Sequence, residues 1–237
     1  MSIKMILFDL DGTLLPMDQE LFVKTYFGKL ATRVAPHGYD PKLLVDAIWK
    51  STAAMIGNEG KKTNEAVFWD AFAAEFGEDV RKDEPLFDAF YREEFDTVKV
   101  SCGYDPAAAR SVYALKEKGF RIALATNPIF PSMATECRIR WAGLKPSDFE
   151  LFTTYENSSY CKPSLAYYER ILEALGATAD ECLMVGNDVA EDMVAQKLGM
   201  KVFLMTECLL NKNGSDISIY PQGDFDDLLA FVDTLNK

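Results

Sequence analysis

The chain has 237 residues, of which 49% are hydrophobic and 26% charged, and its formal net charge is −12 at pH 7. This composition is typical of a soluble globular protein that forms one large α/β domain or two smaller ones. The acidic balance and the lack of Lys/Arg-rich or long apolar runs exclude a nucleic-acid partner and a membrane span.

The first predicted element is a strand over residues 5–8, which runs directly into Asp9 and Asp11 and then into a Gly-Thr turn. Residues two positions apart on a strand share one face, so both carboxylates can turn toward one pocket. Carboxylates are costly to bury, and they repel each other at short range. The folded protein must therefore contain something that offsets this cost.

Residues 17–99 carry apolar side chains at helical spacing and contain no convincing strand pattern. This spacing predicts an all-helical insert of about four helices between the first strand and the rest of the sheet. Pro16 and the segment 102–106 mark the two ends of the insert. We therefore expect a sheet domain built from residues 1–16 and 100–237, and a helical domain over 17–99.

After residue 100, short apolar segments alternate with amphipathic ones, several of which end at a glycine. Strands separated by one helix each imply parallel βαβ units, and nearly continuous apolar strands fit a sheet covered on both faces. The sequence therefore predicts an α/β fold: a Rossmann-like parallel sheet with helices on both faces, plus the inserted all-α helical bundle. The predicted strands are 121–126, 149–155, 182–185 and 201–205, and the predicted helices are 107–118, 132–141, 164–175, 190–198 and 226–235.

Four polar motifs lie near the carboxyl ends of predicted strands, where open α/β sheets bind their ligands. A threonine hydroxyl and backbone N–H groups at a strand–helix turn can hold phosphate oxygens. Two aspartates four residues apart can meet on one helical face. In chain order, the motifs are Asp9 with Asp11, Thr126-Asn127, Lys162-Pro163, and Gly186-Asn187-Asp188 with Asp192.

The ordered motifs D-L-D-G-T, T-N, K-P and G-N-D-x-x-x-D resemble those of the haloacid dehalogenase superfamily. The resemblance spans residues 5–14 and about 120–205, and the helical insert lies where subfamily I of that superfamily carries its helical cap. It implies a Mg²⁺-dependent phosphomonoester hydrolase that acts on a small phosphorylated metabolite through an aspartyl-phosphate intermediate.

The resemblance also implies a catalytic role for each of the first three motifs. Asp9 would attack phosphorus as the nucleophile. Asp11 would act as the general acid for the leaving oxygen and then as the base for water, which requires a raised pKa. Thr126, Asn127 and Lys162 would bind the transferring phosphoryl group.

The same resemblance implies that Mg²⁺ is held by Asp9, Asp188 and the backbone carbonyl of Asp11. Many relatives carry aspartate directly after the glycine of the fourth motif, where this chain has Asn187. Either Asp188 takes the metal or Asn187 is a neutral ligand. We prefer Asp188, because its spacing to Asp192 repeats the family's pattern, and we assign supporting roles to Asn187 and Asp192. A divalent cation and a lysine would offset the paired aspartates and make a local anion site.

Two alternatives stay open at this point, a sugar phosphomutase of the same family and a non-catalytic binding module that kept the fold. Asp11 counts against a dehalogenase, because dehalogenation has no leaving oxygen to protonate. A calcium loop that starts at Asp9 is disfavoured, since Leu14 stands where such a loop needs glycine. Taken alone, Thr126 would be an ordinary helix cap and Lys162 a solvated surface lysine.

The identity of the substrate has no readable code in the sequence. Phe27, Trp49 and Trp69 are expected in the core of the cap rather than at the substrate, because large aromatic side chains are mostly buried. We expect a cytoplasmic protein, since the start of the chain lacks a signal-peptide pattern. A monomer is the default expectation, because no exposed heptad or apolar patch is evident.

Overall fold

The computed structural model describes residues 2–235 and contains a five-stranded parallel sheet in the strand order β2-β1-β3-β4-β5. β1 therefore lies between two strands that follow it much later in the sequence. Every pairing in the sheet is parallel, which confirms the predicted α/β fold. The strands are β1 (Met5–Phe8), β2 (Arg121–Leu124), β3 (Cys182–Gly186), β4 (Lys201–Met205) and β5 (Gln222–Gly223).

Strand register brings the carboxyl ends of the three central strands to one edge of the sheet. Phe8 of β1 pairs with Leu124 of β2 and with Val185 of β3. The backbone N–H of Asp9 donates to the carbonyl of Val185 at 2.9 Å, and that of Ala125 donates to the carbonyl of Phe8 at 2.7 Å. The residues that follow each strand, which include three of the four predicted motifs, therefore meet at this edge.

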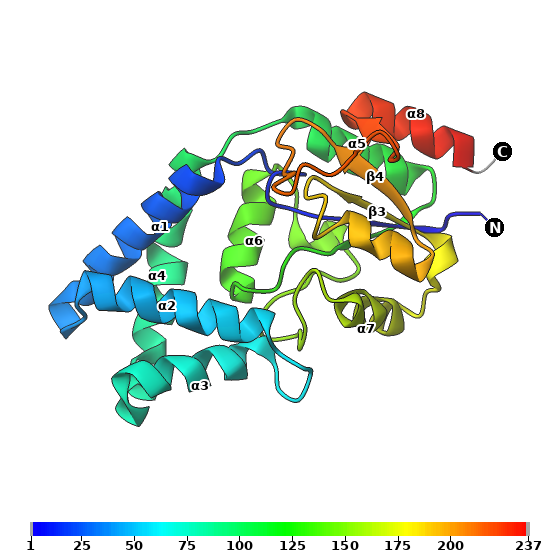
Figure 1. Ribbon diagram of the computed structural model, residues 1–237. Helices are drawn as coiled ribbons and strands as arrows, with labels where there is room; N and C mark the ends of the chain where they lie inside the picture. Colours follow the sequence, from blue (N-terminus) through cyan, green and yellow to red (C-terminus); the bar gives the residue numbers. More distant parts are fainter. Residues whose placement is uncertain (1, 236–237) are drawn as a thin grey trace.

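The sheet is covered on both faces, as its apolar strands predict. Ile6 and Phe8 belong to a core cluster with α5, α6 and α8, whereas Met5 and Leu7 belong to a second cluster with α7. These four side chains of β1 are at most 1% exposed. Figure 1 shows α5 and α8 on one side of the sheet and α7 on the other. The helices are α5 (Pro106–Glu117), α6 (Ser132–Trp141), α7 (Leu165–Leu175) and α8 (Phe225–Leu235).

Between β1 and α5, the described chain forms four α-helices, which Figure 1 shows to one side of the sheet. The carboxylates of Asp18 and Asp40 cap the first two of them by accepting backbone N–H groups of the first turn. The interior is aromatic, because Phe72 packs against the rings of Trp69 and Phe87. No helix within residues 2–235 is long and apolar enough to cross a bilayer. The four helices are α1 (Gln19–Val34), α2 (Pro41–Ile56), α3 (Asn64–Phe76) and α4 (Glu84–Glu93).

The prediction of a strand over 149–155 is wrong. This segment runs beside β2 but forms only an isolated parallel bridge between Leu124 and Phe152. The side chain of Asn157 accepts the backbone N–H of Thr154 at 2.8 Å and donates to the carbonyl of Phe152 at 2.9 Å. These local hydrogen bonds hold a turn, and the backbone N–H of Tyr155 donates to the carbonyl of Phe130 at 3.0 Å and not to β2, so the pairing with β2 does not extend past Thr153.

The predicted helix over 190–198 is instead a turn followed by a 3₁₀ helix at Met193–Leu198. The carboxylate of Asp188 accepts the backbone N–H groups of Ala190 at 2.8 Å and Glu191 at 3.0 Å. These are the contacts of a helix cap, and the backbone N–H of Asp192 donates to the carbonyl of Asp188 at 2.9 Å. The chain then tightens, because the N–H of Ala195 donates to the carbonyl of Asp192, three residues back, at 3.2 Å. The two-residue strand β5 is too short for periodicity to identify.

Candidate active site

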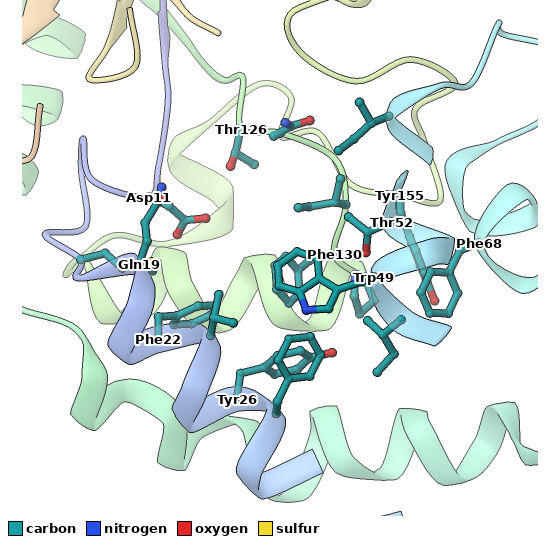
Figure 2. Close-up of a pocket in the computed structure, with 18 of the residues that line it drawn as sticks. Asp11, Gln19, Phe22, Tyr26, Trp49, Thr52, Phe68, Thr126, Phe130 and Tyr155 are labelled. Atoms are coloured by element: carbon teal, nitrogen blue, oxygen red, sulfur yellow. The ribbon is translucent and has the colours of Figure 1, made fainter. Parts of the chain in front are cut away.

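A cavity of about 400 Å³ lies where the carboxyl ends of the strands meet the helical insert. Asp9, Asp11 and Thr126 line the sheet side of this cavity, and residues of α1 to α4 line its other side. Figure 2 shows Asp11 and Thr126 near one end of the cavity and a group of aromatic side chains beyond them. Asn187 and Asp188 also line it, so residues of the first, second and fourth motifs share one cavity.

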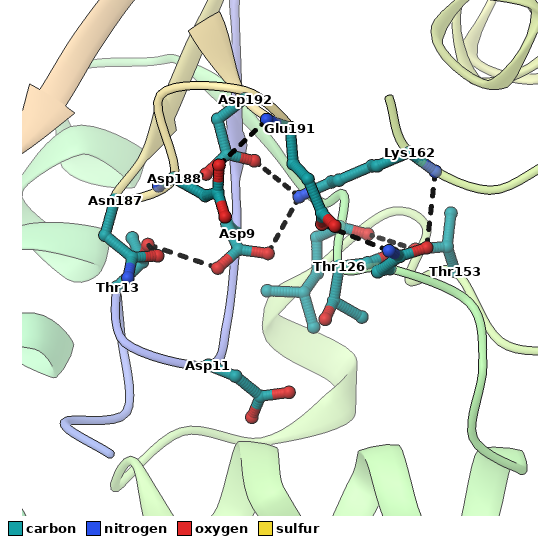
Figure 3. Close-up of polar contacts among 12 residues, drawn as sticks. Asp9, Asp11, Thr13, Thr126, Thr153, Lys162, Asn187, Asp188, Glu191 and Asp192 are labelled. Carbon is teal, nitrogen blue, oxygen red and sulfur yellow. Dashed lines mark hydrogen bonds and ion pairs between the residues drawn. The ribbon is translucent and has the colours of Figure 1, made fainter. Parts of the chain in front are cut away.

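Asp9 and Asp192 share the ammonium group of Lys162, as Figure 3 shows. Lys162 Nζ donates to Asp9 Oδ1 at 2.8 Å and to Asp192 Oδ1 at 2.6 Å. The side chains of Lys162 and Asp192 are each 1% exposed. The third motif therefore joins the first and the fourth, and its lysine offsets the cost of burying their carboxylates.

Electrostatics keep Lys162 in its charged form. Burial alone lowers the pKa of Lys162, but the carboxylates of Asp192 and Asp9 outweigh it and raise that pKa well above its ordinary value. Burial raises the pKa of Asp192, and Lys162 opposes this shift. One cation thus faces two carboxylates, so an additional positive charge at this place would be stabilised.

Asp11 turns toward α6 and pairs with Arg138, whose Nη1 donates to Asp11 Oδ2. The other carboxylate oxygen, Oδ1, is buried and has no hydrogen-bond partner among residues 2–235. Burial raises the pKa of Asp11, Arg138 opposes this shift, and the charge of Asp9 adds to it. One oxygen of Asp11 is therefore left unpaired, and a buried carboxylate oxygen without a partner favours the protonated form of the group.

Arg138 is the site residue that the sequence analysis missed. It is 1% exposed, its guanidinium carbon lies 4.5 Å from the centroid of the Phe130 ring, and its Nη2 donates to Thr135 Oγ1 at 3.2 Å. The sequence gives no clear signal for it, because the buried residues of α6, which include Ala134 and Trp141 as well as Arg138, do not form one apolar face. A buried arginine requires a buried partner, and that partner, Asp11, lies 127 positions away in the chain.

Thr126 and Asn127 are held by the segments around them. The carbonyl of Thr126 accepts the hydroxyl of Thr153 at 2.6 Å, which fixes the turn after β2, and Figure 2 shows the Thr126 side chain at the cavity. Asn127 Oδ1 accepts the backbone N–H of Lys162 at 3.2 Å, and Asn127 Nδ2 donates to Glu191 at 3.0 Å. Both polar groups of the Asn127 side chain thus bond within the protein, and they connect the second motif with the third and the fourth.

Asn187 and Asp188 differ in the groups that they leave free. Asn187 Oδ1 lies 3.1 Å from the Thr13 hydroxyl, and Asn187 Nδ2 donates to the carbonyl of Cys208 at 2.6 Å. Asp188 uses Oδ1 to accept two backbone N–H groups of the following turn, whereas its Oδ2 makes no hydrogen bond within residues 2–235. Asp188 therefore has an oxygen available for a ligand, and the amide of Asn187 is occupied.

The donors around the cavity fit Mg²⁺. Among residues 2–235, no group of three or more His, Cys, Asp or Glu side chains is arranged around one metal position. Mg²⁺ needs fewer, since one or two carboxylates usually hold it while water completes the octahedron. The carboxylates of Asp9 and Asp188 and the backbone carbonyl of Asp11 belong to residues that line one cavity. The excess negative charge beside Lys162 also favours a cation there.

Gly186 ends β3 and lets Asp192 approach the sheet closely. A Cβ atom at this position would lie 2.1 Å from Asp192 Oδ2 and 2.2 Å from its Cγ. We expect Gly186→Ala to displace Asp192 from Lys162 and to lower the free energy of unfolding by about 1–3 kcal/mol, measured by denaturant titration.

Gly28→Ala in α1 is the matched control, because beyond its chain neighbours and the backbone of its own helix no heavy atom lies within 4 Å of the added methyl group. Its free energy of unfolding should stay constant or rise by ~0.5–1 kcal/mol, since alanine favours the helix. Equal stability of Gly186→Ala and the wild-type protein would contradict the steric argument.

Comparison with known proteins finds one family and a relative of low identity. The family model described as haloacid dehalogenase-like hydrolase matches residues 3–199. Pyrophosphatase PpaX of Bacillus cereus (strain AH820) is 25% identical over 248 residues, and the alignment covers 100% of each chain.

Solved structures share the fold over nearly the whole chain. A 2-haloacid dehalogenase from Pseudomonas syringae pv. Tomato DC3000 has a TM-score of 0.63 and 21% identity, with 98% of each chain covered. A HAD phosphatase from Thermococcus onnurineus has a TM-score of 0.60 and 17% identity, with 99% of this chain and 100% of that chain covered. At these identities the likeness establishes the fold alone.

Proposed function

The chain belongs to the haloacid dehalogenase-like hydrolase family, and we propose that this phosphatase hydrolyses phosphomonoesters of small metabolites with the help of Mg²⁺. The proposal includes an aspartyl-phosphate intermediate on Asp9. It also assigns residues 1–16 and 100–237 to the catalytic core and residues 17–99 to a cap that covers the cavity.

The observation that carries the proposal is the buried pair of Asp9 and Lys162 beside the free oxygen of Asp11. A carboxylate is ionised at neutral pH and needs no base to become a nucleophile. The lysine fixes the orientation of the Asp9 carboxylate and presents a positive charge where phosphoryl oxygens would lie. Asp11 has one oxygen anchored by Arg138 and one available for proton transfer.

The reaction has two half-reactions in which Asp11 changes its role. First, an oxygen of Asp9 attacks phosphorus, the ester O–P bond breaks, and the leaving oxygen takes the proton of neutral Asp11. Then a water molecule attacks the same phosphorus and gives a proton to the Asp11 carboxylate. The bond between Asp9 and phosphorus breaks, which releases inorganic phosphate and restores both side chains.

Binding of the phosphoryl group involves neutral and charged partners. The hydroxyl of Thr126 and the ammonium of Lys162 hold phosphoryl oxygens. When bound by Asp9, Asp188 and the backbone carbonyl of Asp11, Mg²⁺ supplies positive charge that stabilises these oxygens during transfer.

Three further polar residues position this machinery. Asp192 shares the ammonium of Lys162, and Asn127 accepts the backbone N–H of the same lysine. Asn187 connects the loop after β3 with Thr13, whose hydroxyl lies 3.2 Å from Asp9 Oδ2. These contacts hold the nucleophile and the lysine in register with each other.

Removing the metal is expected to stop turnover. Chelation with EDTA should lower phosphate release from p-nitrophenyl phosphate at least about a hundredfold, because phosphoryl oxygens would lose their main charge partner. Added Mg²⁺ should restore the rate. Full activity in the presence of the chelator would contradict the metal-dependent mechanism.

The choice between Asp188 and Asn187 as a ligand is tested by thermal unfolding. Mg²⁺ should raise the melting temperature of the wild-type protein but not of Asp188→Asn, since a ligand stabilises only the state that binds it. Asn187→Ala should melt earlier because it loses contacts to Thr13 and Cys208, yet it should keep the Mg²⁺-dependent rise. The reverse pattern would assign the metal to Asn187.

Phosphate release from p-nitrophenyl phosphate also separates the proposed hydrolase from the two alternatives, a sugar phosphomutase and a non-catalytic binding module. A hydrolase releases inorganic phosphate from a simple ester without any acceptor, whereas a sugar phosphomutase returns the phosphoryl group to a bound sugar. A non-catalytic module would release no phosphate at any Mg²⁺ concentration.

A further inference from the structure

The cavity extends well beyond the space that a phosphoryl group needs. Its volume of about 400 Å³ lies within the ~300–1,000 Å³ of pockets that hold drug-sized ligands. One end carries Asp9, Asp11 and Thr126, and the other is lined by side chains of the helical insert. Because the phosphoryl group must sit beside Asp9, the alcohol part of the substrate must occupy the end lined by the insert.

The wall at that end is aromatic and fixed by its own contacts. The ring centroid of Phe130 lies 5.5 Å from that of Tyr26 and 6.0 Å from that of Phe22, both at edge-to-face angles of 72°. The hydroxyls of Tyr26 and Tyr91 bond to each other at 2.7 Å. These hydroxyls are therefore satisfied within the protein, and the wall presents ring carbon atoms to the cavity.

Trp49 is the most exposed of these aromatic residues, which corrects the expectation that it lies in the core of the cap. It is 50% exposed and lines the cavity, whereas Trp69 is 6% exposed. The ring of Trp49 packs edge-on against that of Phe27, which also lines the cavity, with centroids 5.5 Å apart at an angle of 60°. A half-exposed tryptophan in the wall of a cavity is suited to stack on a flat ligand.

Charge at the same end disfavours an anionic leaving group. Asp88 is the single charged residue that the described insert contributes to the lining. A second phosphate or a carboxylate would lose its hydration there and find no cation.

The one basic side chain among the described lining residues, Lys212, belongs to the sheet side of the cavity. It lies two residues after Leu210, whose backbone N–H donates to the carbonyl of Asn187 at 2.9 Å. Lys212 therefore adds positive charge near the phosphoryl end and does not change the character of the aromatic end.

We infer, resting on the proposed function, that the preferred substrate is a phosphomonoester whose alcohol carries an aromatic or similarly large apolar group and no second anionic group. Such a substrate differs from pyrophosphate, the substrate that the name of the relative pyrophosphatase PpaX states. In pyrophosphate the leaving group is itself a phosphate, which carries a second anionic group.

The test compares kcat/KM for esters with leaving alcohols of similar acidity, so that the chemical step stays constant. With the full chain and Mg²⁺, 3-phenylpropyl phosphate should exceed propyl phosphate at least about tenfold, because ring stacking is available only to the first. Within this set, 3-phosphonooxypropanoate should be poorer than propyl phosphate. Pyrophosphate lies outside the set, because its phosphate leaving group is far more acidic than an alcohol, and it should be poorer than propyl phosphate despite that advantage.

Two substitutions in α2 test whether Trp49 is the residue that causes the preference for the phenylpropyl ester. Trp49→Ala should reduce the ratio of kcat/KM between the phenylpropyl and propyl esters at least about fivefold, mainly through KM. Leu43→Ala is the matched control, because Leu43 is 60% exposed on the same helix and does not line the cavity. It should leave the ratio unchanged.

The outcomes separate the inference from the proposed function. Hydrolysis with equal kcat/KM for the phenylpropyl and propyl esters would overturn the inference, and so would a preference for the carboxylate ester or pyrophosphate. Either result would leave the phosphatase assignment intact. Failure to hydrolyse every ester in the presence of Mg²⁺ would overturn the proposed function itself.

Discussion

Asp9→Asn is expected to lower phosphate release from p-nitrophenyl phosphate by about a thousandfold or more. Each factor of ten corresponds to ~1.4 kcal/mol in the activation barrier, so the loss amounts to about 4 kcal/mol. The amide has nearly the shape of the carboxylate but lacks the charge and the nucleophilic oxygen that attack on phosphorus requires.

The fold should survive this substitution. An asparagine oxygen can still accept from Lys162, and the lysine keeps its contact with Asp192 at 2.6 Å. Because the substitution removes one of two carboxylates that face a single cation, we expect an unchanged or higher melting temperature.

Asp233→Asn is the matched control. Asp233 lies in α8, forms a surface ion pair with Lys118 and does not line the cavity. That variant should keep the wild-type rate. A folded Asp9→Asn protein that also kept the wild-type rate would rule out Asp9 as the nucleophile.

Lys162→Met is expected to destabilise the folded protein by about 3–5 kcal/mol, because it leaves Asp9 and Asp192 buried without a counter-charge. For a chain of this size, such a loss lowers the melting temperature by roughly 6–20 °C. The measurement is thermal or denaturant unfolding in the absence of Mg²⁺, so that no bound cation replaces the lysine.

A second substitution identifies the cause of this loss. Adding Asp192→Asn to Lys162→Met removes one of the two unpaired charges and should recover part of the lost stability. Lys118→Met removes an exposed lysine from a surface ion pair and should change the free energy of unfolding by less than about 0.5 kcal/mol. Similar losses in Lys162→Met and Lys118→Met would contradict the compensating role of the buried lysine.

The central features of the site follow from local sequence patterns. Apolar runs that end in polar residues identify β1, β2 and β3, and parallel pairing then brings the residues after them to one edge. The unusual pair of Asp9 and Asp11 at the end of a buried strand already requires a compensating charge. The contact between Asp9 and Lys162 satisfies that requirement across 153 positions of the chain.

Features that depend on contacts remote in sequence could not be predicted. Arg138 has the local pattern of a surface helix residue, and its pairing with Asp11 becomes visible only when α6 packs beside the end of β1. The exposure of Trp49 depends on how α2 faces the cavity, which aromatic composition does not specify. Apolar periodicity also does not separate the 3₁₀ helix at Met193–Leu198 from the α-helix predicted over 190–198, because both place apolar residues three or four positions apart.

The central place of β1 in the sheet has a consequence for synthesis on the ribosome. β1 (Met5–Phe8) is made first, but its neighbours β2 (Arg121–Leu124) and β3 (Cys182–Gly186) come much later. At ~5–20 residues per second, the delay between β1 and β3 is roughly 10–35 s. During that interval the four helices of the insert can pack on one another, while the Met-Ile-Leu-Phe strand first has no partner and then only β2. The surroundings of Asp9 are therefore complete only when Asp192, which shares Lys162 with it, has also left the exit tunnel.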